Sequence, residues 1–174
     1  MKKRRRLFVG GLAVGVVIVV SGAAHAEDIR GVIVRTFVLS ETSRLVGDVT
    51  CQVTGAACIA FGVPNIALNL NGFTISGPND PATGCRGGLT NVGTETGISS
   101  NGQSNVGIRG PGLVQRFQGD GILFLASAPG WVQGVTVSTN CLSGIRIGPT
   151  SAGISVEGNV SVRNGTPAAA CGGI

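Results

Sequence analysis

Apolar and polar residues alternate in short runs that return along the chain, and each run ends in a glycine. The glycines of three successive runs are Gly110, Gly134 and Gly158, spaced 24 residues apart. A second marker, glycine followed by isoleucine, contributes Ile98, Ile122, Ile145 and Ile174. Alternation with a period of two indicates strands, and self-similarity at a fixed period of 20 to 50 residues indicates a solenoid. The pattern therefore predicts an all-β parallel β-helix with 23 or 24 residues per coil.

Aligning the copies on their glycines, with a further copy that ends at Gly72, assigns each position to the interior or the surface. The positions expected inside are Leu68, Val106 and Ile154 (with Gly130 as the exception), then Leu70, Ile108, Val132 and Val156; the four marker isoleucines form another inward stack. The positions expected outside are Asn69, Gly107, Trp131 and Ser155, then Asn71, Arg109, Gln133 and Glu157. Equivalent residues on neighbouring coils should lie about 4.8 Å apart, the spacing between paired strands.

The repeat also divides the chain. We expect an N-terminal cap with the first strands over residues 27–57 and β-helix coils over 58–174, with a Gly-, Thr-, Asn- and Pro-rich loop insertion at 78–96. The chain stops on one more Gly-Ile marker, which suggests that the β-helix is truncated at its C-terminus. The alternative is a short β-helix with a minimal end. An open last coil would present unpaired strand edges, so self-association through that coil is expected.

The first 26 residues have the composition of a secretory signal peptide. A basic start is followed by 14 apolar residues (Leu7 to Val20) and by small residues that end in Ala-x-Ala at Ala26. A membrane anchor is the alternative, but it would need roughly 18 or more apolar residues. We therefore predict cleavage after Ala26, a secreted or periplasmic protein, and no integral membrane span after cleavage.

Removal of this segment changes the charge of the protein. Five of the 13 Lys and Arg residues lie in it, so eight remain against eight Asp and Glu, and the net charge becomes zero. A nucleic-acid partner, which would need a basic surface, is not expected. The segment also contains the only histidine, His25, so the mature chain has no Ser–His or Cys–His nucleophile system and no histidine metal site. We expect no cofactor and no metal.

One block carries a family resemblance. Residues 65–77 (NIALNLNGFTISG), preceded by Gly47-Asp48-Val49-Thr50-Cys51 and followed by the Gly-Ile coils, resemble bacterial exported right-handed parallel β-helix proteins of the pectin-lyase-like superfamily. The accessory β-helix proteins of periplasmic copper enzymes belong to the same broad group. The resemblance covers about residues 37–174 and implies a right-handed, single-stranded parallel β-helix. It does not imply one activity, because the superfamily includes lyases, hydrolases, binding proteins and adhesins.

The sequence departs from the catalytic members of that superfamily. Asn69 stands where such blocks often carry Asp, and the double-Asp, Gly-His-Gly and Arg-Ile-Lys elements of galacturonan hydrolases are missing. No Asp cluster suggests the calcium site of pectate lyases. Only Glu95 and Asp120 are brought near each other by the coil register, since both precede a Gly-Ile marker. They are the alternative catalytic pair for a glycosidase-like reaction, and Asp120 could instead hydrogen-bond a turn.

The five cysteines suit an exported chain. Cys51 and Cys58 flank a turn, and Cys141 and Cys171 precede their markers by four and three residues, which puts them on adjacent coils. We predict the disulfides Cys51–Cys58 and Cys141–Cys171, which leaves Cys85 in the insertion without a partner. Buried free thiols are the alternative. A soft-metal site is disfavoured because no pair has Cys-x2-4-Cys spacing.

Trp131 is the candidate centre of a binding site. The small neighbours expected on either side, Gly107 and Ser155, would leave the indole face uncovered, and the polar positions beside it are Asn69, Asn71, Arg109, Gln133 and Glu157. An aromatic surface beside hydrogen-bonding groups suits a sugar ring. The alternative is that the insertion at 78–96 buries Trp131.

We therefore expect a non-catalytic module of the cell envelope, with a carbohydrate-binding or structural role. The alternatives are a polysaccharide lyase or glycoside hydrolase, and an accessory β-helix that binds a protein partner.

Overall fold

The computed structural model describes residues 26–79, 85, 95–166 and 173–174. The predicted signal peptide lies outside this part of the chain except for Ala26, which is the last residue before the predicted cleavage site. Most of the insertion and Cys171 also lie outside it. The described residues contain strands and turns and no helix, and therefore no helical segment that could cross a membrane.

The described residues form fifteen strands and no helix, so the all-β prediction is confirmed, and the paired strands are parallel. One sheet has five strands, which are β2 (Phe37–Leu39), β4 (Ile59–Phe61), β7 (Ile98–Asn101), β10 (Ile122–Leu125) and β13 (Ile145–Ile147). The other has ten strands. Its first branch contains β5 (Ala67–Asn69), β8 (Val106–Arg109), β11 (Gly130–Gln133) and β14 (Ile154–Glu157), and its second contains β6 (Thr74–Ser76), β9 (Leu113–Gln115), β12 (Thr136–Ser138) and β15 (Val160–Val162). The long strands β1 (Glu27–Ile33) and β3 (Ser43–Cys51) run along both branches.

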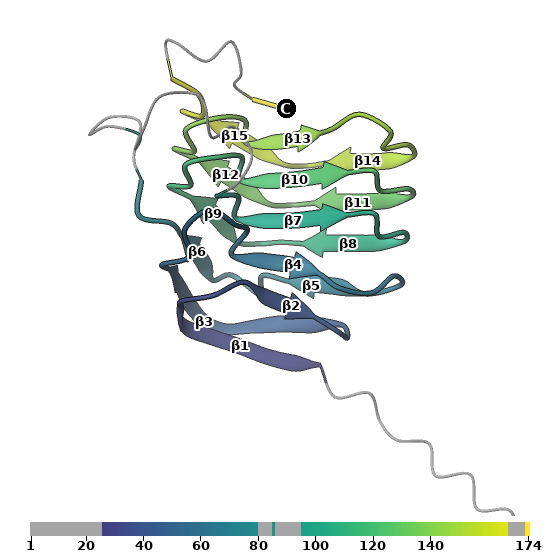
Figure 1. The fold of residues 1–174 in the computed structure, drawn as a ribbon, viewed down its shortest axis with the longest axis horizontal. Helices are drawn as coiled ribbons and strands as arrows, with labels where there is room; N and C mark the ends of the chain where they lie inside the picture. Colours follow the sequence, from purple (N-terminus) through teal and green to yellow (C-terminus); the bar gives the residue numbers. More distant parts are fainter. Residues whose placement is uncertain (1–25, 80–84, 86–94, 167–172) are drawn as a thin grey trace, which may run out of the picture.

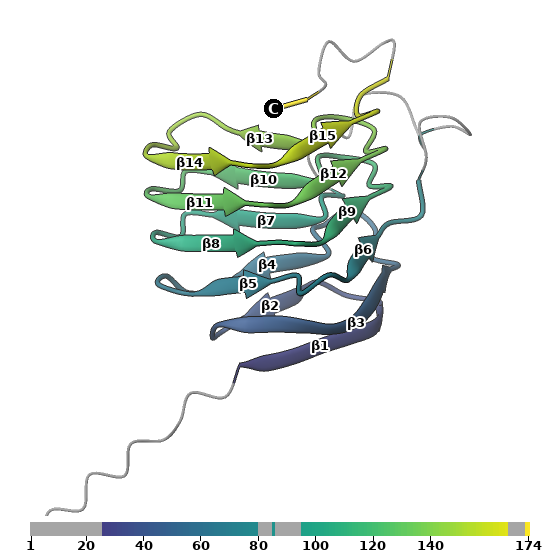
Figure 2. The ribbon, with the colours of Figure 1, turned by 180° about the vertical axis from the view of Figure 1, so that it is seen from behind.

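From β4 onward, each strand pairs with the strand three places later in the sequence, so the chain winds through the three stacks in turn. β7 is followed by β8 and β9, and each of these pairs with the corresponding strand of the next coil, β10, β11 and β12. Figure 1 shows the five-stranded sheet in front, with β1 at one end of the stack and β13 to β15 at the other, and Figure 2 shows the two branches of the larger sheet from behind. This is the arrangement of a parallel β-solenoid.

The core lies between the three stacks and consists of columns of apolar side chains. The marker isoleucines at 98, 122 and 145 pair directly and are almost fully buried, and Ile59 extends their column by one strand. Complete burial of such a side chain contributes about 1.5–3 kcal/mol relative to exposure. The prediction for Ile174 was wrong: the carbonyl of Gly173 accepts the backbone N–H groups of Gly144 and Ile145, but the Ile174 side chain is 67% exposed.

The predicted register is confirmed in the three coils that contain β8, β11 and β14. Gly130 pairs with Val106 on one side and with Ile154 on the other, and Trp131 pairs with Gly107 and Ser155. Gly130 interrupts the apolar column because the Phe124 ring and Ile154 occupy the space where a Cβ would project. Equal coil lengths make this alignment unambiguous.

The predicted register is wrong by two residues in the copy that ends at Gly72. Leu68 pairs with Ile108 rather than with Val106, and Asn69 pairs with Arg109 rather than with Gly107. The reason is that Leu70 and Asn71 stand between this strand and its glycine, where Asn71 and Gly72 form a turn with positive φ (51° and 86°). The glycine of this copy therefore does not follow its strand directly, as Gly110 does.

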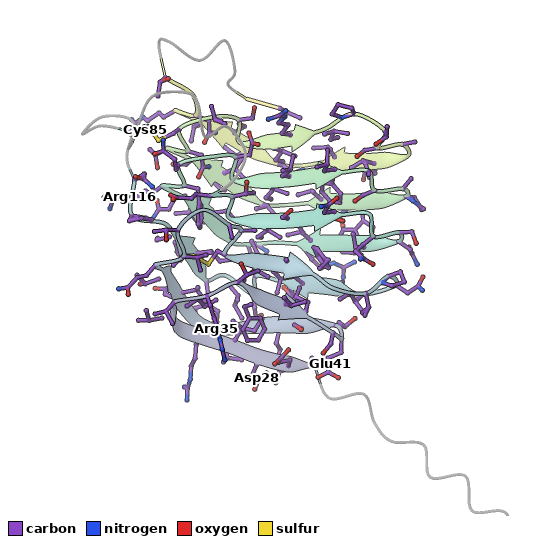
Figure 3. All side chains as sticks on the ribbon, in the orientation of Figure 1. Asp28, Arg35, Glu41, Cys85 and Arg116 are labelled. Atoms are coloured by element: carbon purple, nitrogen blue, oxygen red, sulfur yellow. A yellow bond between two sulfur atoms is a disulfide. The ribbon has the colours of Figure 1, made fainter. Side chains whose placement is uncertain are left out.

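The disulfides agree with the prediction in part. Cys51 and Cys58 are bonded across their turn, as expected. Cys141 is bonded to Cys85, so the predicted Cys141–Cys171 bridge is wrong. The bridge places Cys85, which Figure 3 labels, at the corner between β12 and β13 that contains Cys141. The sequence of the insertion has no periodicity from which this partner could be predicted.

Candidate functional site

A hollow of about 280 Å³ lies on the outer face of β5, β8 and β11, where the sequence placed the binding site. Its lining residues are Thr42, Ala67, Asn69, Arg109 and Trp131. The positions that stack with Trp131 on the two preceding coils are Gly107 and Ala67, so no large side chain fills the space beside the ring. The register of the coils therefore builds the hollow by placing one large ring above two small residues.

Trp131 is partly buried, and its indole lies across Gly107. A Cβ at position 107 would meet the indole carbons at about 2 Å, so only glycine leaves room for the ring. The Arg109 guanidinium lies 5.4 Å from the ring centroid. The expectation of an indole free of neighbouring side chains is therefore wrong, because Arg109, one column away, reaches over it. A cation over an indole is held by the ring's electrostatic field.

Three polar side chains of the hollow have hydrogen-bond donors for which the described residues provide no acceptor. No carboxylate in the described part of the chain lies within ion-pairing distance of Arg109. Asn69 Oδ1 accepts the backbone N–H of Asn71, and the described residues provide no acceptor for the Asn69 amide N–H groups. Thr42 Oγ1 accepts the N–H of Ala67, so its own hydroxyl hydrogen can still be donated. The site thus presents donors beside an aromatic ring.

The other predicted binding residues are only partly brought to this hollow. Gln133 and Glu157 are exposed and continue the column of Asn69 and Arg109, and Glu157 Oε1 accepts the hydroxyl of Ser155 at 2.6 Å. Asn71 is not in this column, because it lies in the turn beyond β5 and donates its side-chain amide to the carbonyl of Leu45.

A second hollow, of about 370 Å³, adjoins the first and shares Thr42 with it. It lies where the turns before β3 and β5 stack, and its lining residues are Ala26, Ser40, Glu41, Thr42, Val63, Pro64 and Ile66. Glu41 and Asp28 lie at the same end of the molecule (Figure 3). The sequence analysis missed this hollow because turn positions carry no repeat signal.

The two alternative catalytic carboxylates, Glu95 and Asp120, accept hydrogen bonds from backbone N–H groups in turns. Glu95 Oε1 accepts the N–H of Gly55 on the coil below, and Asp120 Oδ1 accepts the N–H of Ser143 on the coil above. Asp120 is fully buried, and its Oδ2 lies 3.6 Å from Arg146 Nη1. Burial raises the pKa of Asp120, and the Ser143 N–H and the Arg146 charge oppose this shift. Both carboxylates therefore stabilise turns between coils.

The described residues contain no group of three or more His, Cys, Asp or Glu side chains positioned to share a metal ion. Comparisons of the chain with protein-family models, with curated proteins and with solved structures found no match.

Proposed function

We propose that the protein is an exported, non-catalytic module with a right-handed parallel β-helix fold of the pectin-lyase-like type, and that it binds glycan at the cell envelope. The observation that carries the proposal is the hollow beneath Trp131, where an indole lies beside the guanidinium of Arg109, the amide of Asn69 and the hydroxyl of Thr42. Sugars offer an apolar ring face and many hydroxyl groups, and such a site complements both.

Two further features support binding rather than hydrolysis or lyase chemistry. Glu95 and Asp120, the alternative catalytic carboxylates, each have an oxygen bonded to a turn N–H, and Asp120 is enclosed. A glycosidase needs two carboxyl groups that reach the same bond. The second hollow shares Thr42 with the first, and all of its lining residues except Ala26 follow the predicted cleavage site, so a chain of several sugar units has room to lie across both.

The test is binding to an array of plant and bacterial envelope oligosaccharides, followed by isothermal titration with the best binder. Trp131→Ala should abolish binding, because the apolar contact is lost, whereas Trp131→Phe should retain part of it. Arg109→Met keeps most of the side-chain volume and should weaken binding by removing the donors. Val38→Ala is the control, because Val38 is exposed on β2 in the other sheet.

Gly107→Ala provides an independent test if Trp131→Ala fails to fold. The new methyl group displaces the indole while keeping Trp131 in the chain, so binding should fall although the ring is present. Unchanged binding in folded Trp131→Ala and Gly107→Ala proteins would refute the site. Release of reducing or unsaturated sugars by the parent protein would refute the non-catalytic assignment.

A further inference from the structure

Apolar side chains reach the surface of this solenoid at its two ends. The described residues expose seven large apolar side chains, which are Val32, Val34, Val38, Ile147, Val160, Val162 and Ile174. The first three lie in or between β1 and β2, and the other four follow from β13 onward. These are the opposite ends of the stack in Figure 1. The most exposed large apolar side chains therefore lie at the two ends, where apolar contact remains to be made.

One outward column shows this contrast residue by residue. It crosses six strands, and its members in order are Val32, Thr50, Ser76, Gln115, Ser138 and Val162. The four inner positions are polar, as expected for the solvent-facing side of a sheet. Valine occupies only the two terminal positions. Val160, which is 51% exposed, ends a neighbouring column whose inner members are Thr74, the partly buried Leu113 and Thr136.

The C-terminal end also carries open strand edges. β14 and β15 are the last strands of the two branches of the ten-stranded sheet, and neither has a further strand beside it in the described chain. The edge of β13 is different, because the carbonyl of Gly173 bonds to the backbone at Gly144 and Ile145. An open edge is a template for pairing with another chain. β15 combines such an edge with two exposed valines.

The charges at the ends favour one orientation of a second copy. Head-to-tail stacking would continue the column that runs from Asp28 to Glu157, and would place these two acidic side chains in direct register. Like charges directly opposite each other are destabilising. A two-fold axis through Ser161 avoids this register, because it makes β15 antiparallel to its copy. Val160 then faces the partner subunit's Val162.

We propose that two copies of this chain associate through their C-terminal ends, with β15 pairing antiparallel to β15 of the partner. The valine pairs bury the apolar surface, and the edge N–H and C=O groups of the two strands bond to each other. A two-fold interface of this kind closes on itself, so the product is a dimer rather than a filament. The proposal is independent of glycan binding, because Trp131 faces outward from β11 on the other branch of the sheet.

The test is analytical ultracentrifugation of residues 27–174 over a wide concentration range. All proteins carry Cys171→Ser, because the two bridges use the other four cysteines and a remaining thiol could cross-link copies. The parent should form a dimer. Val160→Thr with Val162→Ser should raise the dissociation constant by about tenfold or more, because the apolar contacts are lost. These substitutions use residues that the same columns already contain at Thr136 and Ser138, so the fold should tolerate them.

Val32→Thr is the matched control, since it makes an equivalent change in the same column at the opposite end. It should leave the dissociation constant unchanged. Equal weakening by Val32→Thr, or species larger than dimers, would indicate head-to-tail stacking and overturn the proposal. A parent protein that stays monomeric at the highest concentration would also overturn it. Circular dichroism of each variant establishes that a loss of association is not a loss of fold.

Discussion

Single residues in this solenoid act mainly on the coils above and below them. Asn140 accepts the N–H of Phe117 from the coil below, and its own N–H is accepted by Asn164 from the coil above. Asn159 in the same way accepts the N–H of Val135 and donates to the carbonyl of Val132. Buried polar groups cost free energy unless they are paired, so these amides complete the corners where strand ladders stop.

Asp120 is the corner residue whose bonds come at an electrostatic cost. Burial raises its pKa above the ordinary value of 3.8, and the Arg146 charge compensates only in part. A folded-state pKa above the unfolded value means that its stabilising contribution is complete below the unfolded pKa and is lost as pH rises through the folded value. Asp120 therefore contributes less to stability at neutral pH than under acidic conditions.

Asp120→Asn should reveal this dependence. At pH 7 the variant should be at least as stable as the parent, because Asn can still accept the Ser143 N–H and carries no buried charge. Its advantage should shrink as the pH falls toward 3.8. Urea unfolding of both proteins between pH 3.5 and 7.5 measures the difference.

Asp28→Asn is the control, because its effect on stability should depend on pH in the opposite direction. The hydrogen bond from Arg44 lowers the pKa of Asp28, so the stability that this carboxylate contributes is present at neutral pH and is lost as the pH falls. A pH-independent difference between Asp120→Asn and the parent would contradict the assignment for Asp120.

At the scale of elements, the two disulfides constrain very different lengths of chain. Cys51–Cys58 closes a turn between residues seven apart, whereas Cys85–Cys141 joins residues 56 apart. In the chain-entropy description, a cross-link stabilises a protein by restricting the unfolded chain, and longer closed segments give a larger effect. The bridge between the insertion and the corner should therefore matter more than the bridge across the turn.

Replacing each pair with serine tests this order. Cys85→Ser with Cys141→Ser should lower the free energy of unfolding by about 4 kcal/mol, and Cys51→Ser with Cys58→Ser by about 2 kcal/mol. Denaturant unfolding under non-reducing conditions gives both values, and peptide mapping of the parent gives the connectivity. A peptide that links Cys141 to Cys171 would contradict the structure.

Features that repeat could be predicted from the sequence, and features that do not repeat could not. The Ile98 column and the Trp131–Gly107 pair were predicted because the glycine markers recur at the same place in each coil and thereby fix which residues stack. The register of Asn69 failed because its coil contains a longer turn. The contact between Arg109 and Trp131 was missed because a column alignment says nothing about side chains that lean sideways. The partner of Cys141 was missed because the path of an insertion is not periodic.

At the scale of the whole molecule, each coil is stabilised by its neighbours, and in the part of the chain that the structure describes, the last strands β14 and β15 have a strand on only one side. Val106 and Ile108 in β8 are buried, whereas Ile154 and Val156, two coils higher, are only partly buried. Stability in a solenoid is approximately the sum of the coils and the contacts between adjacent coils. The C-terminal coil should therefore open before the centre.

Hydrogen exchange measures this gradient. At concentrations where the protein is monomeric, backbone amides of β13 to β15 should exchange faster than those of β7 to β9, because local opening needs less free energy where fewer contacts break. Dimer formation should slow exchange in β15. Uniform exchange along the stack would show that the molecule opens only as a single cooperative unit.

The position of Trp131 has a practical optical consequence. The chain contains one tryptophan and no tyrosine, so near-ultraviolet emission comes almost entirely from this indole. The ring lies at the wall of a hollow with a cation over it. The wavelength of its emission maximum depends on nearby charge and on water. A molecule that enters the hollow, or a displacement of Arg109, should therefore shift the spectrum. The protein thus contains its own single-point optical reporter, which requires no added dye.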